Sequence, residues 1–153
     1  MSHVHETHLP PLVGIGIRER LPVERLPAFF GSAFARLAQV AATGGARFTG
    51  PPFARYFSVA DDQVDLEAVA PLDHPVPAEG RVHGVELPAG AAVEVVHVGP
   101  YDTLHEAHRE IEAWLAEHHR RAVDAVREVY LTEPGSVPDP AEWRTLVVQP
   151  IDG

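Results

Sequence analysis

The alternation of apolar and polar positions predicts a helix flanked by strands, and it does so twice along the chain. In the first half, β-branched residues over Leu12–Arg18 predict a strand. Apolar residues then recur every three or four positions from Val23 to Val40, as in an amphipathic helix. Strands are expected at 53–59 and 64–70, after the helix-breaking pair Pro51-Pro52. The order is strand–helix–strand–strand.

The second half repeats this order, with strands expected at 92–98, 128–132 and 143–149. The helix between the first two has Trp114 at the shoulder of its predicted buried stripe, which consists of Tyr101, Leu104, His108, Ile111 and Leu115. A shift of 78 residues places Pro22 on Pro100, and a shift of 74 places Tyr56 on Tyr130. Such matching indicates an internal duplication.

These elements predict an α+β fold in which two pseudo-symmetric repeats form an antiparallel sheet with two main helices. We expect a flexible, histidine-rich tail at residues 1–10 and a single domain at 11–153. Repeat one spans about 12–72 and repeat two about 81–151. Because each half is too small to bury both faces of its sheet, the halves should pair about a twofold axis and leave a ligand pocket there.

Composition and charge limit the classes of partner that we expect this protein to bind. The chain has 153 residues and a formal net charge of −10, with 12 basic residues that are all arginine. No basic patch is visible, which argues against nucleic-acid binding. No secretion signal and no apolar stretch long enough for a membrane span is seen, so a cytoplasmic protein without membrane association is expected. Monomer and dimer both remain open.

The segment Arg127–Leu131 carries the most informative chemistry. On a strand, Glu128 and Tyr130 point to one face, and we expect Val129 and Leu131 to face the core. A carboxylate beside an aromatic ring in a cleft suits a cation, which gains both charge neutralisation and cation–π attraction. The same desolvation raises a carboxyl pKa and suits a general acid or base, whereas a strand face that simply meets water is the alternative.

Three further residues are candidates for ligand contact. Tyr56 is the counterpart of Tyr130 in the first repeat, Glu67 lies on the neighbouring strand, and Trp114 borders the helix stripe. Core packing is the alternative for Trp114, and a solvated strand face for Glu67. The histidines do not form a metal-binding motif, and there is no glycine-rich phosphate loop. We therefore expect no metal and no cofactor.

Several segments, in this order and spacing, resemble the GyrI-like effector-binding domain of multidrug-sensing AraC- and MerR-type regulators. The matching stretches are VDLEAVAP at 64–71, ELPAG at 86–90, VHVGPYD at 96–102, WLAE at 114–117, REVYL at 127–131 and VVQPI at 147–151. The resemblance implies two strand–helix–strand–strand repeats with a hydrophobic pocket on their axis. It also implies that a glutamate matching Glu128, followed by an aromatic residue matching Tyr130, meets cationic aromatic ligands.

Three functions follow from this resemblance. The first is a free-standing small-molecule-binding protein that captures aromatic or cationic hydrophobic compounds for drug sensing or sequestration, with Tyr56, Glu67, Trp114, Glu128 and Tyr130 as ligand contacts. The second is a hydrolase of cyclopropane-bearing or similar electrophiles, with Glu128 as acid or base and Tyr130 as a catalytic hydrogen-bond donor. The third is an interaction protein similar to a gyrase inhibitor.

Overall fold

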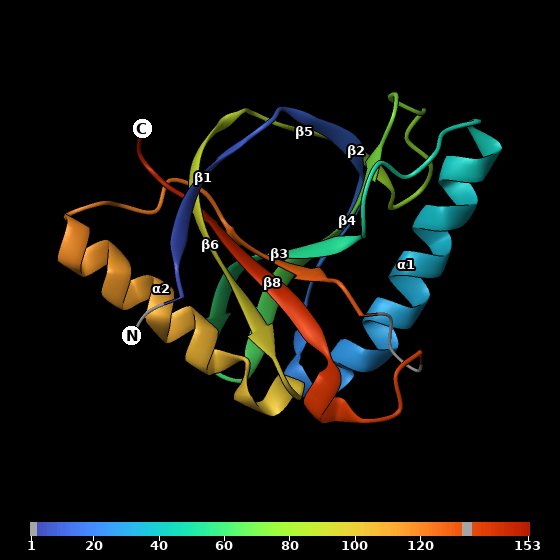
Figure 1. Cartoon of the computed structure of the whole chain (residues 1–153). Coiled ribbons are helices and arrows are strands. Elements are labelled where there is room, and N and C mark those ends of the chain that lie inside the picture. Colours follow the sequence, from blue (N-terminus) through green and yellow to red (C-terminus); the bar gives the residue numbers. More distant parts are fainter. Residues whose placement is uncertain (1–2, 133–135) are drawn as a thin grey trace. The chain divides into compact units, whose positions relative to one another are not determined.

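The computed structural model describes residues 3–132 and 136–153, and the chain divides into two compact units. The α1 unit is Pro11–Pro88, and the α2 unit combines the residues up to Pro10 with Ala89–Gly153. The elements (Figure 1) are β1 (His5–Leu9), β2 (Leu12–Pro22), the 3₁₀ turn η1 (Val23–Arg25), α1 (Leu26–Thr43), β3 (Phe53–Ala60), β4 (Gln63–Leu72), β5 (His83–Leu87), β6 (Gly90–Val98), η2 (Tyr101–Thr103), α2 (His105–His118), β7 (Val126–Tyr130), η3 (Pro140–Glu142) and β8 (Arg144–Pro150).

In the α1 unit, four antiparallel strands lie in the order β3-β4-β2-β5, and α1 packs on β4 and β2. The register pairs Ile17 with Ala68 and Ile15 with Ala70, so these side chains share one face of the sheet. All four are buried and apolar, as is Leu37 of α1. This face is therefore the one that α1 covers, and it holds the core of the unit.

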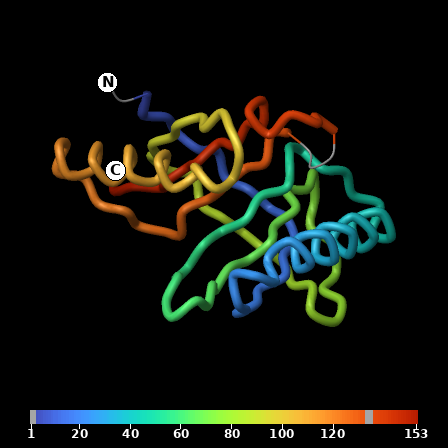
Figure 2. The backbone as a smooth tube through the Cα atoms, turned by 90° about the horizontal axis from the view of Figure 1, so that it is seen from below, coloured from blue at the N-terminus to red at the C-terminus, as the bar shows by residue number. Residues whose placement is uncertain are grey.

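The α2 unit has the same plan, with its antiparallel strands in the order β1-β6-β8-β7 and α2 packed on β6 and β8. Figure 2 shows the helix (orange) running alongside these strands. Val93, Val95 and Val147 form one buried cluster with Ile111 and Trp114 of the helix. Because Val95 and Val147 are register partners, the cluster identifies the sheet face that α2 covers.

The bounds of the elements confirm the predicted repeats. A shift of 78 residues carries β1 onto β5 and the turn η1 onto η2. The strand pairs also correspond, since β5-β2-β4-β3 in one unit matches β1-β6-β8-β7 in the other. The α+β class with antiparallel sheet and two main helices is as the sequence predicts.

The assignment of the edge strands differs from the prediction. His5–Leu9, which we expected in a flexible tail, is β1 and hydrogen-bonds to β6 of the α2 unit. Conversely, β5 pairs with β2 in the α1 unit although it lies within the predicted second repeat. Thus β1 comes before the α1 unit in the chain but pairs within the α2 unit. In the same way, β5 comes before β6 but pairs within the α1 unit. Polar, histidine-rich composition did not reveal β1 because an edge strand needs few buried side chains.

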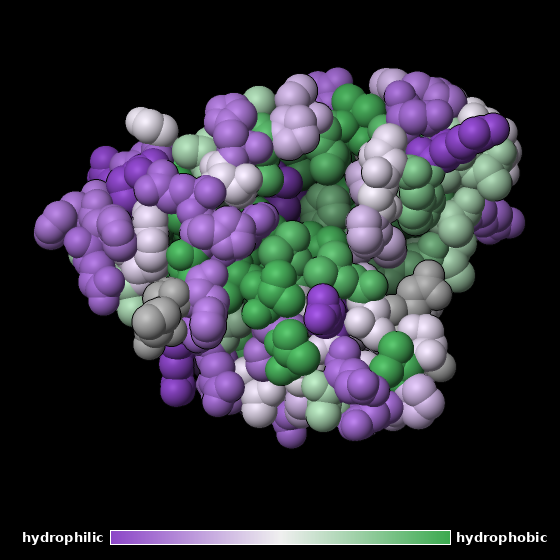
Figure 3. Space-filling view, viewed as in Figure 1, coloured by the Kyte–Doolittle hydropathy of each residue, from purple (hydrophilic) through white to green (hydrophobic). Residues whose placement is uncertain are grey.

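The stripe of α2 is also rotated from the prediction. The buried residues of this region are Leu104, Ala107, Ile111 and Trp114, whereas Leu115 is only partly buried. On the sheet face opposite α2, Val96 and Val98 are 43 % and 56 % exposed. Figure 3 shows apolar side chains (green) gathered in the middle of the view. The unit therefore exposes apolar surface on its uncovered face.

Candidate functional site

The candidate site is built around the Glu128 carboxylate of β7, in the α2 unit. Glu128 is only 8 % exposed. One carboxylate oxygen, Oε1, accepts a hydrogen bond of 3.0 Å from the hydroxyl of Tyr130, two residues along the strand. The other, Oε2, lies 2.7 Å from Nε2 of His108 on α2. Removing a charge from water is costly, and these two contacts offset part of that cost.

Aromatic rings extend from this carboxylate toward the surface. The Tyr101 ring meets the Tyr130 ring edge to face, with centroids 6.0 Å apart, and lies 5.0 Å from the Trp143 ring. The Trp143 indole is held by a 2.8 Å hydrogen bond from its Nε1 to the carbonyl of Val137. Tyr101 is 40 % exposed. A buried anion thus has an aromatic surface next to it.

The electrostatic effect of Glu128 reaches Tyr101. Burial raises the pKa of the Tyr101 hydroxyl above its usual value of 10.0, and the negative charge of Glu128 raises it further. A phenol loses its proton less readily near an anion because the second negative charge is repelled. The pKa of Tyr101 therefore reports on the charge of Glu128.

On β7, the side chains point to the faces of the sheet opposite to those that the sequence predicts. Glu128 is the register partner of Val147, which belongs to the cluster under α2. Glu128 and Tyr130 therefore point to the helix-covered face. Val129 lies on the other face, and Leu131 is 45 % exposed. The expectation that Val129 and Leu131 face the core is wrong, because a helix supplies His108 as a polar partner on the covered face.

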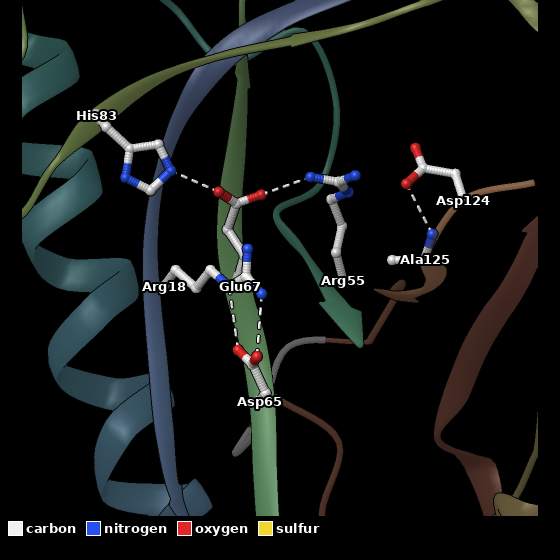
Figure 4. A network of polar contacts seen from close by, with 7 residues as sticks. All are labelled: Arg18, Arg55, Asp65, Glu67, His83, Asp124 and Ala125. Atoms are coloured by element: carbon white, nitrogen blue, oxygen red, sulfur yellow. Dashed lines mark hydrogen bonds and ion pairs between the residues drawn. The ribbon is translucent and has the colours of Figure 1, made fainter. Parts of the chain in front are cut away.

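The second predicted glutamate, Glu67, lies in the α1 unit and is already saturated by partners (Figure 4). It is 5 % exposed. Its Oε1 accepts a 2.8 Å bond from Nη1 of Arg55, and its Oε2 lies 2.5 Å from Nε2 of His83. A side chain at Gly16 would begin 3.1 Å from the Glu67 carboxyl carbon, so glycine leaves room for this group. With Arg55 neutralising it, Glu67 offers less to a cation than Glu128 does.

Next to this group, Arg18 and Asp65 form a two-point ion pair, with both hydrogen bonds at 3.0 Å. The guanidinium lowers the pKa of the Asp65 carboxyl, first through the hydrogen bonds and then through its charge. Arg18 also lies 3.8 Å above the ring of Phe57. The α1 unit thus has its charges paired with one another on the face opposite α1.

The other two predicted ligand residues have different surroundings. Tyr56 lies on β3 beside Leu66, on the face of the α1-unit sheet opposite to that of Glu67. Trp114 is 8 % exposed, belongs to the core cluster of the α2 unit, and stacks on His118 with ring centroids 4.0 Å apart. Core packing accounts for the Trp114 ring, and its contact with a ligand stays a prediction.

Sequence reasoning did not assign a site role to His108, Tyr101 and Trp143. The sequence pattern places His108 and Tyr101 in the buried stripe of a helix, and Trp143 at the start of a strand. The signal that could have found His108 is its own type, because a histidine among apolar stripe residues requires a polar partner. Nothing in the sequence shows that this partner is Glu128, twenty residues further on.

Two structural findings bear on other classes of function. Among the described residues, no three histidine, aspartate or glutamate side chains come together as a possible metal site. Within the same part of the chain, no helix has the length and hydropathy of a membrane span.

Comparisons with known proteins place this fold. The C-terminal domain of EcmrR is similar over 99 % of this chain and 98 % of that domain, with 21 % identity and a TM-score of 0.83. In the EcmrR–DNA complex the TM-score is 0.86 at 22 % identity, with 98 % of this chain covered, and the match spans only 57 % of the EcmrR chain. This chain is thus a little over half as long as EcmrR. No curated protein sequence matches it.

Two more distant structures share the fold. SAV2435, solved with bound tetraphenylphosphonium, has a TM-score of 0.65 at 11 % identity, covering 99 % of this chain and 94 % of SAV2435. A hydrolase from Listeria innocua has a TM-score of 0.68 at 15 % identity, covering 97 % and 91 %. The family model of the GyrI-like small-molecule-binding domain matches residues 3–152. With nearly its whole length matched, the chain belongs to the GyrI-like small-molecule-binding domain family.

Proposed function

We propose that this protein captures an aromatic or hydrophobic cation and that Glu128 of the α2 unit is its counter-ion. The observation that carries the proposal is the nearly complete burial of Glu128 beside the rings of Tyr130 and Tyr101. A cation that reaches this carboxylate gains an ion pair in a region of low dielectric. Contact with the aromatic rings adds about 0.5–2 kcal/mol of cation–π attraction.

The first repeat supports the view that the fold itself does not require this charge. The shifts that superimpose the repeats place Ala54 where Glu128 lies and Phe30 where His108 lies. Ala54 pairs with Ala68 as Glu128 pairs with Val147, so the two positions are also equivalent in register. An apolar pair thus serves the α1 unit at positions where the α2 unit buries a carboxylate and a histidine. Burial of a charge that the fold can do without points to function.

The family supports the same class of ligand. Its members are described as small-molecule-binding domains, and SAV2435 was solved with tetraphenylphosphonium, a lipophilic cation with four aromatic rings. Sensing or sequestration of such compounds needs no catalytic group.

Calorimetric titration with tetraphenylphosphonium tests the proposal. We expect Glu128→Gln to weaken binding at least about 10-fold, since one lost ion pair in a buried site is worth more than 1.4 kcal/mol. Glu94→Gln is the matched control, because it removes the same charge from the opposite face of the same sheet. Equal affinity of wild type and Glu128→Gln, or no binding by either, would reject the proposal.

A second candidate is hydrolysis of an electrophilic small molecule at the same residues. The 3.0 Å bond between Tyr130 and Glu128 favours it, since a carboxylate that activates water and a phenol that donates a hydrogen bond are then adjacent. The structurally similar protein from Listeria innocua that is described as a hydrolase supports the same candidate activity. Turnover of a strained cyclopropane-bearing electrophile, abolished in Glu128→Gln, would establish this activity. A stable one-to-one complex without turnover would eliminate it.

A further inference from the structure

The hydroxyl of Thr145 is a second polar group buried on the face that carries Glu128. Thr145 is 0 % exposed. It lies on β8, two residues from Val147, and its register partners are Tyr130 on β7 and His97 on β6. Among the residues that the structure describes, its Oγ1 atom has no hydrogen-bond partner. A buried hydroxyl without a partner lowers stability, so such groups are uncommon in folded proteins.

The first repeat again shows what the fold requires at this place. Leu66 of β4 pairs with Tyr56 on β3 and with Glu19 on β2, as Thr145 pairs with Tyr130 and His97. Leu66 is also 0 % exposed. The equivalent strand position is thus filled by an apolar side chain in one unit and by an unpartnered hydroxyl in the other. Packing does not account for the hydroxyl.

We propose that Thr145 is a specificity residue whose hydroxyl binds a hydrogen-bonding group of the cation held by Glu128. Diagonal neighbours on adjacent strands lie about 7 Å apart, which is the spacing of Glu128 and Thr145 across β7 and β8. The preferred ligand is an aromatic cation that carries N–H groups, such as an amidinium or a primary ammonium. This inference rests on the proposed function and adds the ligand class to it.

Access to Thr145 follows from the contacts of Tyr130. The Tyr130 hydroxyl donates a hydrogen bond to Glu128 Oε1. Tyr130 is also the register partner of Thr145 on the neighbouring strand, so the two side chains lie side by side on one face of the sheet. A cation that takes over Oε1 displaces the hydroxyl, and movement of the ring then uncovers Thr145. One exchange therefore opens both polar groups to the ligand.

Two cations distinguish this role from general packing. The bis-amidine dye 4′,6-diamidino-2-phenylindole carries N–H donors, whereas tetraphenylphosphonium carries none. We expect Thr145→Val to weaken binding of the dye about 10-fold and to leave tetraphenylphosphonium affinity within about 2-fold. Thr145→Ser, which keeps a hydroxyl, should retain dye affinity. Thr145→Val should also raise Tm by about 2–4 °C, because the unpartnered hydroxyl is gone.

The outcomes separate the two proposals. If wild type binds tetraphenylphosphonium through Glu128 while Thr145→Val keeps full affinity for the dye, the Thr145 inference is overturned and the proposed function stands. Equal weakening of both cations in Thr145→Val shows a packing effect and also overturns the inference. If wild type binds neither cation, both proposals are wrong.

Discussion

At the scale of single residues, Glu128 holds a charge at a position that alanine fills in the other repeat. Both of its oxygens have a partner, Tyr130 on one side and His108 on the other. Because hydrogen bonds to a carboxylate are strong, the group is stabilised in place without being neutralised by an arginine, as Glu67 is. This difference between the two buried glutamates is the reason why we propose Glu128, and not Glu67, as the cation site.

The titration of Tyr101 tests its electrostatic interaction with Glu128. Its pKa is raised above 10.0 by burial and then by Glu128. In Glu128→Gln, the second cause is removed and the first remains. The pKa of Tyr101 should therefore fall toward its usual value without reaching it, as followed by NMR of ¹³Cζ-labelled tyrosine. Glu94→Gln should leave it unchanged. An unchanged Tyr101 pKa in Glu128→Gln would show that the two groups do not interact.

Asp65 gives the α1 unit a defined response to acid. Arg18 lowers the pKa of Asp65 below 3.8 in the folded protein. The pair thus contributes stability above pH 3.8, and this is lost as the pH falls through the folded-state pKa. Because Arg18 is half exposed, the contribution is about 0.5–1 kcal/mol. Asp65→Asn should lower the free energy of unfolding by this amount at pH 6, and the stabilities of the two proteins should converge once the pH falls below the folded-state pKa of Asp65. A difference that persists in strong acid would contradict this account.

At the scale of elements, the sequence predicts where most strands and helices lie, but not which side chains of β7 point to the core. Runs of β-branched residues and the Pro and Gly breaks place most strand ends within two or three residues of those observed. In β7, however, Val129 and Tyr130 are both suited to a core, so alternation alone allows either face. The pairing of His108 with Glu128 depends on how α2 crosses the sheet, which no local pattern contains.

Trp114 belongs to the helix α2, and its surroundings predict a structural role. Its ring lies in the core cluster with Ile111 and Val147. Trp114→Ala should therefore lower the free energy of unfolding by about 3–5 kcal/mol, measured by denaturant titration. Trp114→Phe, which keeps an aromatic ring, should retain tetraphenylphosphonium affinity within about 2-fold because the core remains filled. A stable Trp114→Phe protein that no longer binds would instead establish the ligand contact expected from the sequence.

The contact of α2 with β7 predicts an effect of His108 that is opposite to that of Glu128. His108 occupies Oε2 of Glu128 and so competes with an incoming cation. His108→Phe, which introduces the residue type of the first repeat, should raise tetraphenylphosphonium affinity about 3- to 10-fold by removing this competition. The free energy of unfolding should fall by about 1–3 kcal/mol because the carboxylate loses a partner. His105→Phe, on the exposed side of α2, is the control. Weaker binding in His108→Phe would mean that the histidine itself contacts the ligand.

At the scale of the whole molecule, duplication explains both what was predictable and what was not. The repeated element order, with shifts of 74 to 79 residues between the halves, is visible in the sequence and agrees with the strand pairing. The placement of β1 and β5 was not visible, because the strands of an antiparallel pair can lie far apart in the sequence. Strand pairing is equivalent in the two units, but they bury different groups at equivalent positions. Glu128 and Thr145 of the α2 unit correspond to Ala54 and Leu66 of the α1 unit.

The central claim is that a cation binds at Glu128, and an anomalous-scattering measurement tests it most directly. Crystals grown with tetraphenylarsonium, the arsenic counterpart of the phosphonium ion, locate the cation by the arsenic signal alone. The account predicts one peak beside the Glu128 carboxylate, with the Tyr130–Glu128 hydrogen bond broken. A peak at the Arg55–Glu67–His83 group, or on the exposed face carrying Val96 and Val98, with Glu128 still bonded to Tyr130, would contradict it.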